Sequence, residues 1–250
     1  MASSRRHIII AEDILPASLF RLPFFVKGRE VWLTPGFRPV RGWIVQQILK
    51  LCAVDFTPAD VLVFMDTDVF FIRSFEPRCV LTGDGNVRLL QKPGVGQSPS
   101  HQQWHQAAAK LLNIPPQPYF GADFIGNLIT WRRDVAMALR ERITETGKAN
   151  WAKQLSRELS ISEYIVYGIF VQELLGPERS GHSYTEEDLC LNSWDLIRRD
   201  QAAEQHDKFV AEVAGAVRPE HVAVNIQSNL GFPPSDYRKV ISSIEHVVEN

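Results

Sequence analysis

Two aspartates, Asp66 and Asp68, are the residues of this sequence whose spacing most directly indicates chemistry. They stand one residue apart, directly after the apolar run Val61 to Met65, and apolar residues resume at Val69. Such a run is typical of a strand buried on both faces of a parallel sheet, and ligands bind at the carboxyl ends of such strands. Two carboxylates this close repel each other unless a divalent cation lies beside them, and that cation also binds phosphate. The pair therefore predicts a metal–diphosphate site; the alternative is a turn whose carboxylates cap backbone amides.

The composition is that of an ordinary globular protein. The 250 residues are 45% hydrophobic and 22% charged, with a net charge of −2. This balance argues against a nucleic-acid-binding protein or one held on an anionic membrane. No apolar run is long enough for a membrane span, so any membrane contact is expected to be peripheral. The cysteines Cys52, Cys79 and Cys190 are odd in number and widely spaced, which favours reduced thiols in the cytoplasm over a zinc site or disulfides.

Strand and helix patterns alternate along the chain, which predicts an α/β fold in a single domain over residues 1–250. The N-terminal apolar patch is too short for a signal peptide and is interpreted as a strand. Strands are expected at His7 to Ile10, Val31 to Leu33, Val61 to Met65, Val87 to Leu90, Phe124 to Trp131 and His221 to Ile226. Helices are expected at Gly42 to Val54, Ser100 to Leu112, Arg133 to Thr144, Ser160 or Ser162 to Leu175, Ala202 to Val213, and after Pro234.

Two classes of enzyme place an Asp-x-Asp motif after a strand. In haloacid-dehalogenase-type phosphatases a Thr or Val normally stands two residues after the second Asp, and Phe70 occupies that position here. Those enzymes also need a downstream acidic motif, for which Glu187-Asp188 is the one faint candidate. The other class is the nucleotide-sugar glycosyltransferases, and the sequence around the aspartates favours them.

Four patterns in order carry a resemblance to this second class: Arg41-Gly42-Trp43-Ile44-Val45-Gln46-Gln47, Asp66-Thr67-Asp68, Tyr119-Phe120-Gly121-Ala122-Asp123, and Ser162-Glu163-Tyr164-Ile165-Val166-Tyr167-Gly168. Together they resemble the GT-A glycosyltransferase fold, and more closely a group of bacterial GT-A-like proteins. The resemblance covers about residues 8–232. It implies a GT-A-like fold with a mainly parallel central sheet flanked by helices. The implied activity is transfer of a sugar from a UDP- or GDP-sugar donor to a glycan, lipid-linked or small-molecule acceptor.

The resemblance also implies a metal site. Asp68 would coordinate Mn²⁺ or Mg²⁺ directly, and Asp66 would contact the metal or the ribose of the donor. A third ligand commonly comes from a histidine near the C-terminal end of the domain, and His221 is the first candidate, ahead of His182. For each histidine the alternative is a structural role.

The donor and acceptor residues follow from the same resemblance. Lys50 and Gln47 would face the donor from the helix that precedes the metal strand, and Gly121 would let the backbone approach the donor closely. Asp123 would accept hydrogen bonds from sugar hydroxyls, and Glu163 would be the general base that activates the acceptor. The alternatives are that Lys50 and Gln47 face water, that Asp123 caps a turn, and that Glu163 interacts favourably with the helix dipole.

One departure from the GT-A pattern bears on activity. A GT-A domain begins with a strand–helix–strand unit that binds the nucleotide base, whereas here one clear strand precedes the helix at Gly42. We expect the first part of the nucleotide pocket to be missing, as in an N-terminally truncated form. This leaves open a degenerate GT-A domain that binds a nucleotide or glycan without turnover.

Overall fold

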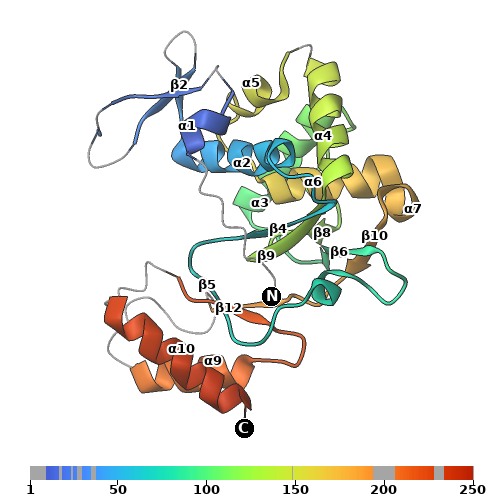
Figure 1. Cartoon of the computed structure of the whole chain (residues 1–250). Helices are drawn as coiled ribbons and strands as arrows, with labels where there is room; N and C mark the ends of the chain where they lie inside the picture. The colour runs from blue at the N-terminus through green and yellow to red at the C-terminus, as the bar shows by residue number, and fades with distance from the viewer. Residues whose placement is uncertain are drawn as a thin grey trace. The chain divides into compact units, whose positions relative to one another are not determined.

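The computed structural model describes residues 10–16, 19–23, 25–26, 30–34, 38–147, 149–193, 206–227 and 234–249 (Figure 1). The chain forms two compact units, each built from separate segments. Unit 1 consists of Met1–Asp60, Gly94–Asp123 and Arg132–Gly176, and unit 2 consists of Val61–Pro93, Phe124–Trp131 and Pro177–Asn250. The chain therefore passes several times from one unit to the other.

Unit 1 is mainly helical. Its helices are α1 (Ala11–Ile14), α2 (Gly42–Cys52), η1 (Ala53–Asp55), α3 (Pro99–Leu112), α4 (Arg133–Gly147), α5 (Trp151–Leu155), α6 (Glu163–Phe170) and η3 (Val171–Leu175). Its strands are β1 (Phe20–Arg21), β2 (Trp32–Thr34), β3 (Arg38–Val40) and β8 (Ala122–Asp123), and β1, β2 and β3 form an antiparallel sheet.

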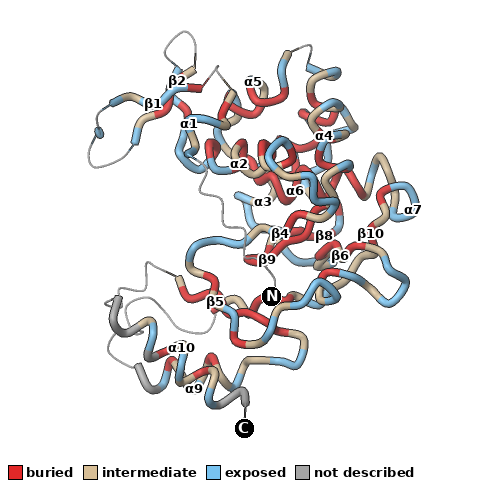
Figure 2. Tube along the Cα trace, in the orientation of Figure 1, coloured by how far each residue is buried: buried red, intermediate tan, exposed pale blue. Residues whose placement is uncertain are grey.

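The centre of unit 1 is α6, on which α3 packs. All eight residues of α6 are buried, as the red tube of Figure 2 shows. Its residues are apolar or aromatic except Glu163 at its start. The helix continues as the π-helical segment η3 and ends at Gly176, whose φ of 74° suits glycine. At the start of α3 the Ser98 hydroxyl caps the helix, and Pro99 follows at the first helical position.

Unit 2 contains most of the strands. They are β4 (Val61–Met65), β5 (Val69–Phe71), β6 (Val87–Leu90), β7 (Lys92–Pro93), β9 (Leu128–Arg132, whose last residue belongs to unit 1), β10 (His182–Thr185), β11 (Cys190–Asn192) and β12 (Ala223–Asn225). Its helices are η2 (Pro77–Val80), most of α7 (Gly176–Ser180), α9 (His206–Ala216) and α10 (Pro234–Glu249).

The strands of unit 2 form small sheets. Strand β4 pairs with β9, β6 pairs in parallel with β10, and β12 lies between β11, which is parallel to it, and β5, which is antiparallel. Helices α9 and α10 pack on this last sheet through a buried cluster formed by Ile72, Phe209, Val213, Val224, Ile226, Val240 and Ile244.

The mixed α/β class predicted from the sequence is confirmed, and the helix predictions agree with α2, α3, α4, α6 with η3, α9 and α10. The described residues form no long, mainly parallel central sheet, since their sheets have two or three strands. The expectation that β4 is buried on both faces was wrong, because Val63 and Met65 are 38% and 47% exposed. An apolar run alone does not distinguish a strand buried on both faces from one with an open face.

Two further strand predictions differ from the structure or fall largely outside the described residues, and two strands were not predicted. The strand predicted from Phe124 begins only at Leu128, and the polar region after Gly176 contains β10 and β11, which were not predicted. Of the strand predicted at His7 to Ile10, only Ile10 is described, and it precedes α1. Among the described helices, none combines the length and the apolar character that crossing a membrane would need.

Candidate functional site

In unit 2, the two aspartates occupy the turn between β4 and β5. Asp66 is exposed and Asp68 is half-buried. The Asp68 carboxylate accepts a hydrogen bond from the side-chain amide of Asn225 (Nδ2 to Oδ1, 2.9 Å), and its carbonyl accepts one from the Ile226 N–H at 2.9 Å. Because Asn225 is 1% exposed and lies on β12, the paired strands β5 and β12 fix the orientation of Asp68.

The two carboxylates of this turn suit an open cation site that a substrate completes, and they do not form a closed structural metal site. Among the described residues, no group of three or more His, Cys, Asp or Glu side chains could hold a metal ion. A closed structural site of the zinc type is therefore not formed there. Mg²⁺ and similar cations bind through one or two carboxylates, with substrate phosphates and water as the remaining ligands. Asp66 and Asp68 fit a cation that binds together with a diphosphate.

His221 does not join the aspartates in such a group. Its Nδ1 accepts a hydrogen bond from the Arg218 N–H at 2.9 Å, and the residue is 6% exposed. Burial lowers the pKa of His221. The neutral ring therefore carries its proton on Nε2, and metal coordination would require that proton to leave or the bond to Arg218 to break.

His221 instead lines a cavity of about 700 Å³ in unit 2. The Lys92–Asp188 ion pair, with 2.8 Å between Nζ and Oδ2, lines the same cavity. His182, the second histidine candidate, is fully buried on β10, with its Nδ1 3.0 Å from the carbonyl oxygen of Val87. Both histidines have structural contacts, and the role of His221 as a third ligand stays a prediction.

In unit 1, Lys50 connects α2 to the start of α6. Its Nζ lies 2.9 Å from the Glu163 carboxylate and 2.6 Å from the Tyr164 hydroxyl. The side chains of Lys50 and Glu163 are 20% and 5% exposed, so the ion pair is largely shielded from water. Burial alone would lower the pKa of Lys50, but the charges and hydrogen bonds of Glu163 and Tyr164 outweigh it and raise the pKa above its ordinary value. Glu163 could accept a proton as a general base only after a substrate had weakened this pair.

Gln47 lies beside Lys50 and is 1% exposed. Trp43, Gln47 and Lys50 are four and three residues apart, so they share one face of α2. Neither Nε2 nor Oε1 of Gln47 has a hydrogen-bond partner among the described residues. A buried amide without partners costs about 1–3 kcal/mol. The alternative in which Gln47 faces water does not hold, and its role towards the donor stays a prediction.

The predicted sugar-binding residues Gly121 and Asp123 also lie in unit 1. Gly121 has a φ of +88°, and a Cβ placed on it would contact nothing within 4 Å. Asp123 is 6% exposed, and its Oδ2 lies 3.8 Å from Nε2 of His101. The space beside Gly121 is therefore open, and its role towards the donor stays a prediction, whereas Asp123 is half of a largely buried Asp–His contact.

The structure thus divides the predicted residues between the units. Gln47, Lys50 and Glu163 form one contiguous group in unit 1, which also contains Gly121 and Asp123, whereas Asp66, Asp68 and His221 are in unit 2. Sequence reasoning gave no role to Asn225, which lies in the strand predicted at His221 to Ile226, and did not foresee the contact between Tyr164 and Lys50.

A family comparison places the chain among known sequences. The matching family is a family of unknown function, DUF6492, and the match covers residues 2–247. The chain belongs to the DUF6492 family. No curated protein matches it.

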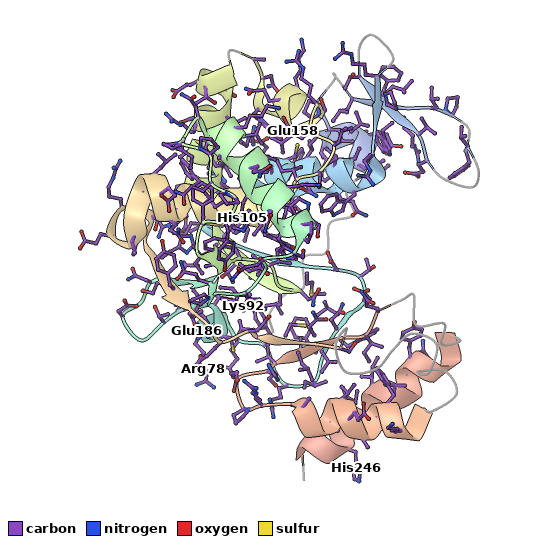
Figure 3. All side chains as sticks on the ribbon, turned by 180° about the vertical axis from the view of Figure 1, so that it is seen from behind. Arg78, Lys92, His105, Glu158, Glu186 and His246 are labelled. Atoms are coloured by element: carbon purple, nitrogen blue, oxygen red, sulfur yellow. The ribbon has the colours of Figure 1, made fainter. Side chains whose placement is uncertain are left out.

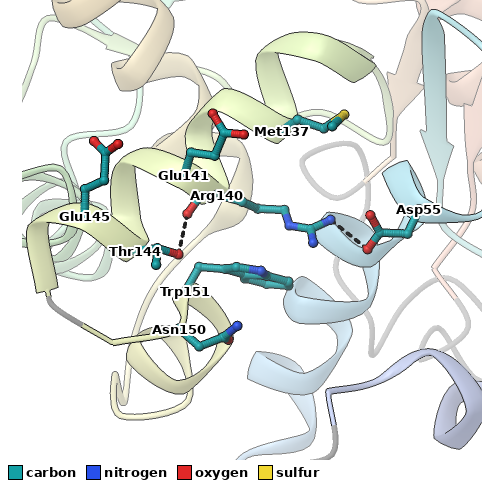
Figure 4. Close-up of a pocket in the computed structure, with 8 residues that line it drawn as sticks. All are labelled: Asp55, Met137, Arg140, Glu141, Thr144, Glu145, Asn150 and Trp151. Atoms are coloured by element: carbon teal, nitrogen blue, oxygen red, sulfur yellow. Dashed lines mark hydrogen bonds and ion pairs between the residues drawn. The ribbon is translucent and has the colours of Figure 1, made fainter.

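One cavity lined by described residues of unit 1 in this DUF6492 protein has a volume of about 360 Å³ and contains none of the predicted site residues (Figure 4). Its Arg140 guanidinium lies 2.8 Å from the Asp55 carboxylate and 4.7 Å from the centre of the Trp151 ring. Figure 4 shows the side chain of Arg140 extended towards Asp55 above Trp151. The arginine of this cavity is therefore already paired with Asp55 and stacked on Trp151.

We predict that the stability of the protein depends on pH through His105 on α3, which is labelled in Figure 3. It is fully buried; its Nδ1 accepts a hydrogen bond from the Phe120 N–H at 3.3 Å. Burial, followed by the charge of His101, lowers its pKa from 6.5 to about 4. Between these values the unfolded chain binds a proton that the folded chain does not, so stability falls as the pH falls. We expect the loss of stability between pH 7 and pH 4 to reach roughly 3 kcal/mol.

The measurement is urea unfolding between pH 7 and pH 4 for the wild type and for His105→Asn, whose Oδ1 can replace the Nδ1 acceptor. The variant will be less stable at pH 7, because it leaves a cavity. Its stability should depend less on pH than that of the wild type. Equal pH dependence of the two proteins would show that His105 is not the titrating group.

Proposed function

We propose that this DUF6492 protein is a metal-dependent glycosyltransferase of the GT-A type, which moves a sugar from a UDP- or GDP-sugar to an acceptor. The observation that carries the proposal is the Asp66-Thr67-Asp68 turn directly after β4, in which Asn225 orients one carboxylate and the other is open to solvent. A turn with two acidic side chains, one of them held by a buried amide from a neighbouring strand, suits the capture of a cation with its phosphates.

In this proposal the chain's own residues hold the donor at its diphosphate. Asp68 would supply a carboxylate oxygen to Mn²⁺ or Mg²⁺, and Asn225 would keep that carboxylate in a fixed orientation. Asp66 would contact the metal or the donor ribose. When bound, the cation neutralises the diphosphate and stabilises its departure as the leaving group.

The acceptor would be activated by Glu163. Its carboxylate would take the proton from the acceptor hydroxyl as the new bond to the sugar carbon forms and the bond from that carbon to the diphosphate breaks. Lys50, 2.9 Å from Glu163, holds the carboxylate in place before substrate binds. The Gln47 amide on the same face of α2 would offer its donors and acceptor to the substrate.

A non-catalytic binding protein is the second candidate, and one observation favours it. The Glu163 carboxylate is already paired with Lys50 in the absence of substrate, as a purely structural ion pair would be. Such a protein would bind a nucleotide or a glycan and release no product.

The test is the release of UDP or GDP from a panel of UDP- and GDP-sugars in the presence of Mn²⁺, compared with EDTA. A transferase should hydrolyse one donor slowly without any acceptor, and only with metal. An aryl phosphate serves as the control substrate. Release of phosphate from it, with no nucleotide release, would instead indicate a phosphatase that uses Asp66 as nucleophile. No release from either substrate would contradict the catalytic proposal.

A further inference from the structure

The cavity of about 700 Å³ that His221 lines is large enough for a small ligand, since ligand sites in proteins measure about 300–1,000 Å³. Its described lining comes from β7, the segment between β10 and β11, β11 itself, the end of α9 and the loop that leads to β12, all within unit 2. Figure 3 labels two of the lining residues, Lys92 and Glu186. Neither Asp66 nor Asp68 is among the described residues of the lining, so the proposed metal turn leaves this cavity without a role.

Lys92 and Asp188 offer the cavity a hydrogen-bond donor and an acceptor side by side. The Lys92 ammonium donates to Oδ2 of Asp188 at 2.8 Å and to the Ile125 carbonyl at 3.3 Å, and its third N–H has no partner among the described residues. The Asp188 carboxylate accepts from Lys92 and, through Oδ1, from the Cys190 N–H at 3.1 Å, which leaves lone pairs on both oxygens. The side chains of Lys92 and Asp188 are 27% and 14% exposed, so a ligand in the cavity can reach both.

The ring of His221 offers the cavity a further donor. Its Nδ1 accepts from the Arg218 N–H, so the neutral ring carries its proton on Nε2. Nε2 has no hydrogen-bond partner among the described residues, and it is not one of their fully enclosed unpartnered atoms. Since His221 is 6% exposed and lines the cavity, this N–H of a well-packed ring is open to a ligand there.

The charges of the lining disfavour an anionic ligand. Four carboxylates line the cavity against two basic side chains: Glu186, Glu187, Asp188 and Glu220, against Lys92 and Arg218. Three of the carboxylates have a basic partner within 4.0 Å, and only Glu186 has none among the described residues. A phosphate or a carboxylate would meet like charge there, whereas hydroxyls and ammonium groups would not.

We propose that this cavity binds a sugar that carries hydroxyls or an amino group and no acidic group. Neighbouring hydroxyls of a sugar ring each donate and accept, so two of them can use the free N–H of Lys92 and the lone pairs of Asp188, while a third accepts from Nε2–H of His221. An amino group would gain from the uncompensated charge of Glu186. The inference rests on the proposed function in one respect: the bound sugar would be the acceptor of the transfer.

The experiment is a titration of the full chain at pH 7, in EDTA and without nucleotide, followed by saturation-transfer NMR. The ligands are glucose, galactose and mannose, each as the neutral sugar, the 2-amino sugar and the uronic acid, so that charge varies while the ring is kept. We expect the neutral and amino forms of at least one sugar to bind with a millimolar Kd. Its uronic acid should bind at least about fivefold more weakly than the neutral form.

Two variants locate the binding in this cavity. His221→Asn keeps an acceptor for the Arg218 N–H, because Oδ1 can replace Nδ1, but has no donor at the position of Nε2. It should weaken the binding of every form about fivefold, with the fold checked by circular dichroism. Glu186→Gln should weaken the amino sugar towards the neutral one and leave the neutral sugar unchanged. Glu178→Gln, at an exposed acid on α7 outside the described lining, is the control and should change neither.

The outcomes separate this inference from the proposed function, because the titration contains neither metal nor donor. Sugar binding that His221→Asn weakens supports the cavity site, even if no nucleotide sugar is hydrolysed. The inference is overturned if none of the sugars binds, if the uronic acid binds as tightly as the neutral sugar, or if His221→Asn leaves the affinity unchanged. Each of these results would leave metal-dependent hydrolysis of a nucleotide sugar unaffected.

Discussion

Replacing Asp68 with asparagine should reduce Mn²⁺-dependent release of nucleotide from the preferred donor sugar by about 100-fold or more. The substitution keeps the size of the side chain and the Asn225 contact within reach but removes the charge that would hold the cation. Polarisation of a phosphoryl oxygen by a metal is worth several kcal/mol, which corresponds to this loss of rate. Initial rates at saturating and at low Mn²⁺ concentrations are the measurement, and the apparent affinity for Mn²⁺ should fall as well.

Asp60→Asn is the matched control, because Asp60 is exposed and precedes the same strand, β4, at its other end. It should retain wild-type rates. If Asp60→Asn and Asp68→Asn lose activity equally, the effect reflects the net charge of the region. If Asp68→Asn keeps wild-type activity, Asp68 is no metal ligand.

Replacing Glu163 with glutamine should destabilise the folded protein by about 3 kcal/mol. The change leaves the Lys50 ammonium largely buried without its 2.9 Å carboxylate partner. The raised pKa of Lys50 means that the stabilisation is fully present below the ordinary pKa of a lysine and is lost only as the pH rises through the higher value in the folded state. Urea unfolding at neutral pH therefore measures the whole effect.

A second ion pair of unit 1 provides the control. Lys110 lies 2.6 Å from Glu158, which Figure 3 labels, but the Lys110 side chain is 71% exposed. Glu158→Gln, which leaves only the exposed Lys110 ammonium without its partner, should therefore cost less than about 1 kcal/mol. The double variant Lys50→Met/Glu163→Gln should recover part of the stability that Glu163→Gln loses, because no unpaired charge remains. Equal losses for the buried and exposed pairs would contradict the role assigned to burial.

Helical elements could be predicted from the sequence, because their apolar residues recur with the helical period. The buried stripe of α2 and the apolar residues of α6 after Glu163 are both evident in the sequence. Strand pairing could not be predicted in the same way. The run Val61 to Met65 indicated a strand, but whether Val63 faces a neighbour or solvent depends on which strands lie beside β4.

In the candidate site, too, the features with a local sequence pattern could be predicted and the long-range contacts could not. The acidic pair was evident because its two residues are neighbours in the sequence, and the signal for Glu163 was its position at the start of a predicted helix. The partners of these residues were not evident, since Asn225 reaches Asp68 only through the pairing of β12 with β5. Likewise, Lys50 meets Glu163 only because α2 packs on α6. Long-range contacts of this kind leave no local pattern in a single sequence.

Isothermal titration calorimetry with UDP and GDP, each with and without Mn²⁺, tests the central claim most directly. We predict that one of the two nucleotides binds the wild-type chain in the presence of Mn²⁺ and binds much more weakly in EDTA, and that Asp68→Asn shows no such difference. Binding that is equal with and without Mn²⁺, or no binding of either nucleotide, would contradict a metal–diphosphate site at Asp66 and Asp68.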